Sequence, residues 1–76
     1  MEGLDRITIN PAVMAGKPCI RGMRITVGMV VSEIGAGHSI ESILEDFPYL
    51  EREDIMQALR YAALMVSERE VVLASA

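Results

Sequence analysis

The sequence predicts a small, mainly α-helical domain in which three helices form a helix-turn-helix bundle preceded by two short β-strands. Three observations support this fold class. The chain has 76 residues, a length that suits one domain and not two. Apolar residues alternate with polar ones near the N-terminus and recur every three or four positions from residue 26 onward. No Gly or Pro follows Pro48. We expect residues 1–76 to form a single domain, with strands and turns over 6–25 and the helical bundle over 26–73.

The first part of the chain is typical of short extended segments. Residues 6–10 (Arg-Ile-Thr-Ile-Asn) alternate polar and apolar side chains, which predicts a strand that the Asn10-Pro11 pair then ends in a turn. Residues 16–18 (Gly-Lys-Pro) form a second break, and Cys19-Ile20 follows as a second short strand. The chain turns again at Gly22. Two strands this short are not stable alone, so they require support from the helices or from a partner chain.

The first two helices are predicted from their caps and apolar stripes. Thr26 suits the N-cap of a helix that would end at Gly35 or Gly37, and its apolar stripe comprises Val27, Val30, Val31 and Ile34. Ser39 suits the N-cap of a second helix that Pro48 ends near Asp46, and its stripe comprises Ile40, Ile43, Leu44 and Phe47.

The third helix is expected to begin near Glu51 or Arg52 after a turn of four or five residues. Its predicted apolar stripe is Ile55, Leu59, Ala62 or Ala63, and Val66. A helix of more than about fifteen residues exceeds what so small a core needs, and flexible methionines suit adaptable interfaces. The alternative is that the methionines fill the core. The surplus predicts a homodimer interface formed by Met56, Met65, Val66, Val71 and Val72.

The charge is divided between the two halves of the chain, whose formal net charge is −4. Residues 1–38 carry four basic and three acidic residues, a balance of +1, with no acid between Arg6 and Ser32. Residues 39–76 carry three basic and eight acidic residues, a balance of −5. Such asymmetry indicates two faces with different partners, although solvated helix surfaces would produce the same pattern.

The third helix occupies the recognition position of a helix-turn-helix, and five residues near its start are expected to be exposed. Of these, Arg52, Gln57 and Arg60 could contact DNA, whereas Glu53 and Asp54 would repel phosphates. The basic residues Lys17, Arg21 and Arg24 could instead contact the DNA backbone or enter an acidic pocket of a partner protein.

Nothing in the sequence points to an enzyme. The chain has one His (His38) and one Cys (Cys19) on different predicted elements, and no spacing typical of a metal site or a phosphate-binding loop. We expect no catalytic residues, no metal and no cofactor. The single Cys, the lack of a signal-peptide pattern and apolar runs too short for a bilayer predict a cytoplasmic protein without a membrane partner.

A succession of motifs from Arg6 to Ala63 resembles a bacterial and archaeal family. The most specific stretch is residues 16–25, Gly-Lys-Pro-Cys-Ile-Arg-Gly-Met-Arg-Ile; the others are residues 6–11, 36–41, 47–50 and 54–62. The family is the one called domain of unknown function four-three-three, described as antitoxin-like. Met23 stands where the family usually has Thr. Glu51 stands where Thr or Ser would cap the third helix, which weakens that cap.

The resemblance implies a homeodomain-like helix-turn-helix, dimeric, that serves as the antitoxin of a type II toxin–antitoxin pair. The implied partner is a PIN-like ribonuclease toxin, whose clustered carboxylates an antitoxin Lys or Arg can occupy. Lys17, Arg21 and Arg24 are the toxin-binding residues that this implies. Three functions stay open: an antitoxin that binds operator DNA as a dimer or toxin complex, a protein-interaction module without a DNA role, and a stand-alone repressor.

Overall fold

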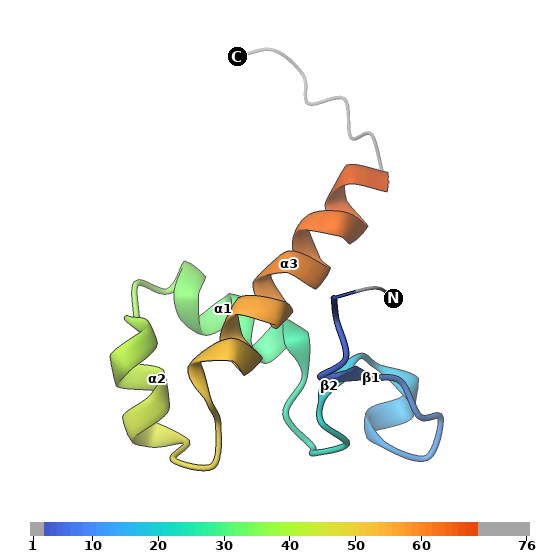
Figure 1. Cartoon of the computed structure of the whole chain (residues 1–76), viewed down its shortest axis with the longest axis horizontal. Helices are drawn as coiled ribbons and strands as arrows, with labels where there is room; N and C mark the ends of the chain where they lie inside the picture. The colour runs from blue at the N-terminus through green and yellow to red at the C-terminus, as the bar shows by residue number, and fades with distance from the viewer. Residues whose placement is uncertain (1–2, 69–76) are drawn as a thin grey trace.

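The computed structural model describes residues 3–68, which form three α-helices after a two-stranded antiparallel sheet (Figure 1). The strands are β1 (Ile7–Thr8) and β2 (Cys19–Ile20), separated by a short 3-10 turn, η1 (Met14–Gly16). The helices are α1 (Val27–Gly35), α2 (Ile40–Asp46) and α3 (Arg52–Glu68). The predicted fold class, mainly α with two short strands at the N-terminal side, is confirmed. Positions 69–73 of the predicted bundle lie outside the described residues.

The sheet consists of only two residue pairs. Ile7 pairs with Ile20 and Thr8 with Cys19, so β1 is shorter than the predicted strand over 6–10. Pro18 precedes β2 and has no N–H to donate, and the chain turns directly after Ile20. The Ile20 N–H donates to the Ile25 carbonyl at 2.9 Å, which continues the extended segment toward α1.

The helix caps form as predicted. The Thr26 hydroxyl accepts a hydrogen bond from the Met29 N–H at 3.0 Å, and the Ser39 hydroxyl accepts one from the Ser42 N–H at 3.0 Å. The helix α2 ends at Asp46, and five residues connect it to α3, which is the spacing of a helix-turn-helix.

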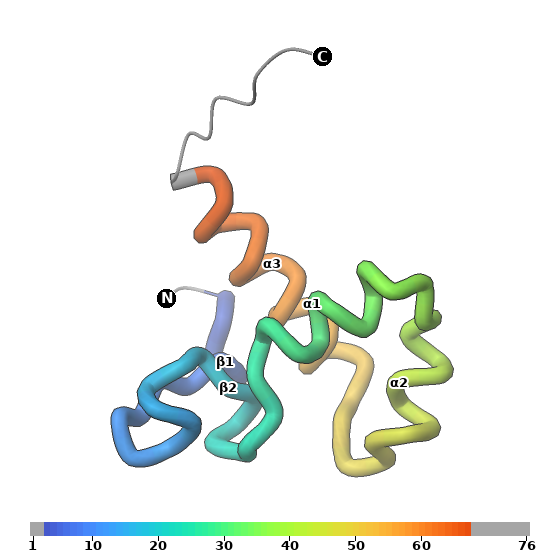
Figure 2. The backbone as a smooth tube through the Cα atoms, turned by 180° about the vertical axis from the view of Figure 1, so that it is seen from behind, coloured from blue at the N-terminus to red at the C-terminus, as the bar shows by residue number. Residues whose placement is uncertain are grey.

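The core lies chiefly between α1 and α3. Ile20, Val30, Ile43 and Ile55 are essentially inaccessible to solvent, and they are surrounded by the buried Leu4, Ile25, Val27, Leu50, Ala58 and Tyr61. Each fully buried aliphatic side chain contributes roughly 1.5–3 kcal/mol. The strand pair and α2 flank this contact on opposite sides (Figure 2).

The apolar stripe of α3 differs from the predicted one. The buried positions are Ile55, Ala58 and Tyr61, whereas Leu59 and Ala62 are half-buried and Val66 is 70% exposed. The C-terminal half of α3 extends past the other described elements (Figure 1), and residues 3–68 leave Val66 largely uncovered. The inclusion of Val66 in the core stripe was therefore wrong.

Candidate functional site

Asp54, the third residue of α3, has a fully buried carboxylate. It is the centre of a group of charged side chains, the Asp54 cluster, that also contains Arg6, Arg21 and Glu51. It accepts hydrogen bonds from Arg21 (Nε to Oδ1, 3.0 Å; Nη2 to Oδ2, 2.8 Å) and from Arg6 (Nη1 to Oδ1, 3.0 Å). It also accepts the Glu51 N–H at 2.8 Å, as the third helical residue of a capping box does. The expectation that Asp54 is exposed was wrong, because its carboxylate joins three segments of the chain.

This arrangement keeps Asp54 ionised. Burial raises the pKa of Asp54, and the hydrogen bonds from Arg21, Glu51 and Arg6 lower it further than burial raises it, so that the pKa lies below its ordinary value. The hydrogen bond to Asp54 correspondingly raises the pKa of Arg21. Arg6 also forms an ion pair with Glu51 at the rim of the cluster. A buried carboxylate with two arginines is a fully paired group.

Arg21 occupies an unusual backbone conformation. Its φ is +44° and that of Gly22 is +72°, and the Met23 N–H donates to the Ile20 carbonyl at 2.8 Å, which together describe a type I′ turn. The same guanidinium donates to the Tyr49 carbonyl at 2.9 Å. Arg21 was predicted as a toxin-binding residue; its guanidinium bridges this turn and the start of α3, and its side chain stays 39% exposed.

Gln57 is a second residue whose expected exposure was wrong. It is 3% exposed, its Oε1 accepts the Arg6 N–H at 2.9 Å, and its Nε2 donates to Asp5 at 2.8 Å and to Glu53 at 3.2 Å. Every polar atom of the amide is thus used to hold the N-terminal segment against α3. Both N–H groups of the amide are engaged within the chain, so the buried Gln57 has no free donor for a base edge.

The other two residues predicted to contact DNA, Arg52 and Arg60, lie exposed on α3 but carry acidic partners. Arg52 Nη1 lies 3.1 Å from Glu41 Oε1, and Arg60 Nη2 lies 2.9 Å from Glu53 Oε2. The hydrogen bond from Arg60 is the main reason that the pKa of Glu53 is lowered. The first turns of α3 therefore present charges that are neutralised within the chain.

Lys17 and Arg24 differ from the arginines of α3 in having no acidic partner among residues 3–68. Both side chains are exposed. Arg24 lies in a bend between the half-buried Met23 and the buried Ile25. Lys17 follows η1, where Met14 and Ala15 both have positive φ. These are the members of the predicted basic group that are free to contact a partner.

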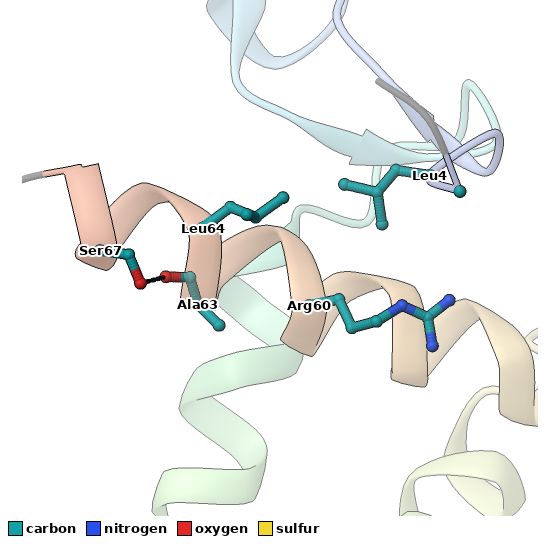
Figure 3. Close-up of a pocket in the computed structure, with 6 residues that line it drawn as sticks. Leu4, Arg60, Ala63, Leu64 and Ser67 are labelled. Carbon is teal, nitrogen blue, oxygen red and sulfur yellow. Dashed lines mark hydrogen bonds between the residues drawn. The ribbon is translucent and has the colours of Figure 1, made fainter.

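A shallow groove of about 480 Å³ lies between the N-terminal segment and the second half of α3 (Figure 3). Its lining residues are Gly3, Leu4, Arg60, Ala63, Leu64 and Ser67. Of the predicted dimer residues, Met56 and Val66 are exposed and Met65 is half-buried against the core, while Val71 and Val72 lie outside the described residues.

Some of the polar residues that organise the structure could not be found from local patterns. Arg6 and Asp5 contact α3 from 48 and 52 residues away, and no spacing indicates this. Asp54 did carry a signal, because an acid three residues after an N-cap residue indicates a capping box. Within residues 3–68, no group of three or more His, Cys, Asp or Glu side chains is arranged to hold a metal ion. No helix of that part is long and apolar enough to span a bilayer.

Comparisons with known proteins support a single family. The model of the family described as "Protein of unknown function (DUF433)" matches residues 7–62. A protein of Sinorhizobium fredii called "Uncharacterized protein y4eO" is 41% identical over 56 residues, which are 74% of this chain and 25% of that protein. This chain thus spans about a quarter of that relative's length.

The fold has a crystallographic counterpart. The crystal structure of a DUF433 member protein from Anabaena variabilis superposes with a TM-score of 0.78 at 30% identity, over 84% of this chain and 63% of that one. The region that the family model matches, residues 7–62, contains the Asp54 cluster apart from Arg6 and includes Lys17, Arg24 and Gln57. On this evidence the chain belongs to the DUF433 family of proteins of unknown function.

Proposed function

We propose that this chain is a protein-binding module, the antitoxin of a toxin–antitoxin pair, which neutralises a PIN-like ribonuclease through Lys17 and Arg24. The observation that carries the proposal is the contrast among the cations of residues 3–68. Arg6, Arg21, Arg52 and Arg60 are paired with carboxylates of the chain, whereas Lys17 and Arg24 are exposed and unpaired there.

The surroundings of Lys17 and Arg24 suit an acidic partner. Both lie in the acid-free stretch between Arg6 and Ser32, so no neighbouring carboxylate in sequence competes for them. A guanidinium presents a planar fork of donors that matches a carboxylate in two hydrogen bonds, and an ammonium acts as a compact point charge. The clustered carboxylates that hold a divalent metal in such a nuclease offer the complementary charge, so an inserted cation would compete with that metal.

The turn that precedes Arg24 is anchored to the start of α3. Arg21 makes this connection, since its side chain is held by the buried Asp54 and by the Tyr49 carbonyl. A pre-positioned side chain loses less conformational entropy on binding, which favours affinity. Arg21 therefore has a place in the proposal as a positioning residue for Arg24.

In this proposal, operator DNA is bound by the antitoxin–toxin complex and not by this chain alone. Arg52 and Arg60 are neutralised by Glu41 and Glu53, and Gln57 is buried, so α3 alone offers few free donors to DNA. Phosphate neutralisation supplies most non-specific DNA affinity, and a second, more basic chain would have to supply it here. A stand-alone repressor is the less favoured function for the same reason.

The test uses the product of the gene adjacent to the one for this chain, which the proposal expects to be a PIN-like ribonuclease. We expect the Lys17→Glu/Arg24→Glu double variant to lose rescue of growth on co-expression and to bind the nuclease at least about 100-fold more weakly in calorimetry. The control is Arg52→Glu on the exposed face of α3, a single charge reversal that matches each of the single variants Lys17→Glu and Arg24→Glu, and it should bind as the wild type does. Unchanged affinity of the double variant, or an equal loss in the control, would contradict the proposal.

A further inference from the structure

The exposed face of α3 carries two arginines in a line along the helix. Arg52, Met56 and Arg60 follow the spacing i, i+4, i+8, and all three side chains are exposed. Eight residues of helix separate Arg52 from Arg60 by about 12 Å along the axis, which is close to the width of the major groove of DNA. The second helix of a helix-turn-helix, here α3, is the one that enters that groove. The spacing of the two cations therefore suits the phosphates on either side of a major groove.

Each of these arginines is bound to one carboxylate of the chain. Arg52 Nη1 donates to Glu41 of α2 at 3.1 Å, and Arg60 Nη2 donates to Glu53 of α3 at 2.9 Å. The side chains of the first pair are 61% and 70% exposed, and those of the second are 51% and 47% exposed. Exposed ion pairs contribute little to stability and are screened by salt. Unlike the buried Asp54, these carboxylates can therefore be exchanged for another anion without disturbing the core.

Glu41 and Glu53 are ionised at neutral pH. The hydrogen bond from Arg60 is the main cause that lowers the pKa of Glu53, and a backbone hydrogen bond followed by the one from Arg52 lowers the pKa of Glu41. Carboxylate and phosphate oxygens accept the same hydrogen bonds from a guanidinium. Each glutamate thus occupies the place on its arginine that a phosphate of DNA would take.

We infer that Glu41 and Glu53 are built-in competitors of DNA phosphates, which hold Arg52 and Arg60 in the free chain and release them when a duplex is brought against α3. The inference rests on the proposed function only in that α3 faces operator DNA. It gives a physical reason for the need of a second, basic chain. By attracting the duplex, such a chain raises the local concentration of phosphates at α3 and shifts the exchange toward DNA.

Glu45 and Asp46 provide a matched comparison for the two competitors. Both are exposed at the end of α2, and neither forms an ion pair with any residue of 3–68. Converting this pair to amides changes the net charge by the same amount as converting Glu41 and Glu53. A general effect of net charge would be equal for the two pairs, whereas release of the arginines is specific to Glu41 and Glu53.

The test measures the fluorescence anisotropy of a short labelled DNA duplex titrated with the full chain alone at several salt concentrations. We expect Glu41→Gln/Glu53→Gln to bind at least about 10-fold more tightly than the wild type, with a steeper dependence of log affinity on log salt by about 2, since two arginines become free for phosphates. Glu45→Gln/Asp46→Asn should change the affinity by less than about threefold, because salt screens charges that do not contact the duplex.

A second background isolates the exchange. In a chain that also carries Arg52→Gln and Arg60→Gln, conversion of Glu41 and Glu53 should give no more than the gain of the control pair, because no arginine is left to release. Glu53→Gln keeps an oxygen acceptor for Gln57 Nε2, which lies 3.2 Å from the carboxylate, so this contact is retained. Circular dichroism and thermal unfolding verify that each variant is folded.

Three results would overturn the inference. The first is a gain in Glu41→Gln/Glu53→Gln that does not exceed the gain of the control pair. The second is an equal gain in the background that lacks both arginines, which would show an effect of net charge alone. The third is an unchanged DNA affinity with tighter binding to the product of the adjacent gene, which would assign this face of α3 to a protein. The DNA measurement needs no nuclease, so a failure of the antitoxin proposal is distinguishable from a failure of this inference.

Discussion

Arg21 and Asp54 form a two-pronged ion pair that joins a turn between the strands and the helices to the first turn of α3. The guanidinium donates from Nε and Nη2 to the two carboxylate oxygens at 3.0 and 2.8 Å, across 33 residues of sequence. Asp54 is fully buried, and the Arg21 side chain is 39% exposed. The carboxylate is therefore shielded from water while both of its cationic partners, Arg6 and Arg21, stay partly exposed.

Replacing Asp54 by Ala should be among the most destabilising single changes in the chain. The change removes the acceptor of three arginine hydrogen bonds and of the Glu51 N–H. Breaking a buried pair costs about 3–5 kcal/mol, and the partial exposure of Arg6 and Arg21 places this case at the lower end. Chemical unfolding followed by circular dichroism measures the loss. Glu45→Ala, at an exposed acid of α2, is the control and should change stability by less than about 0.5 kcal/mol.

The stability should fall at acid pH through the same group. The pKa of Asp54 is lower in the folded protein than in the unfolded chain, so its stabilising effect is complete above the unfolded pKa of about 4 and is lost as pH falls through the folded value. The pKa values of Asp5 and Glu53 are lowered too and act in the same direction. We expect the free energy of unfolding to decrease below about pH 4. An Asp54→Asn variant should show a shallower decrease; an identical slope in the two proteins would argue against this assignment.

Substitutions in the turn at Arg21 and Gly22 should show how much its backbone and its side chain each contribute to stability. Gly22→Ala introduces a Cβ that meets no atom within 4 Å, so its cost of about 1–2 kcal/mol comes from the positive φ alone. Arg21→Lys keeps the charge but cannot donate from two positions of a planar fork, and we expect a loss of about 1–2 kcal/mol. If Arg21 positions Arg24, Arg21→Lys should also weaken nuclease binding, whereas Gly28→Ala in α1 should not.

Gln57 should behave as a structural residue and not as a reader of bases. Its substitution by Leu leaves the Arg6 N–H without its acceptor and removes the hydrogen bonds to Asp5 and Glu53. The expected loss is about 1–3 kcal/mol of stability. Thermal unfolding measures this loss, and the operator affinity of the nuclease complex, measured well below the melting temperature, should stay within about twofold of the wild type. A selective loss of operator affinity at full stability would restore Gln57 to the DNA-contacting group.

The isolated chain should bind DNA weakly. Its net charge is −4, and the exposed arginines of α3 are paired with Glu41 and Glu53. Few phosphates would be neutralised, so the logarithm of affinity should change little with the logarithm of salt concentration. Fluorescence anisotropy with the DNA upstream of the gene, at several salt concentrations, measures the slope with and without the nuclease. Tight binding with a steep slope by the chain alone would favour a stand-alone repressor.

Periodicity and caps were sufficient to predict the elements of this fold. Thr26 and Ser39 are local signals, since a cap and the N–H that it accepts lie three residues apart, and both formed as expected. The interior of the polar cluster was not predictable in this way. Asp54 and Gln57 look like exposed helix residues until Arg6 and Arg21, which lie far away in sequence, approach them. Burial of a polar residue depends on such distant partners, and a pattern along one helix does not contain them.

The long-range character of the Asp54 cluster also determines how the domain can assemble on the ribosome. The paired strands have two residues each and are not stable alone. Their support comes from contacts to α3 through Arg6 and Arg21, across 48 and 33 residues. The strand pair therefore gains these two contacts only after most of the chain has been synthesised. A chain interrupted before residue 52 would lack the carboxylate that gathers its first third, and it would leave that third exposed to proteases.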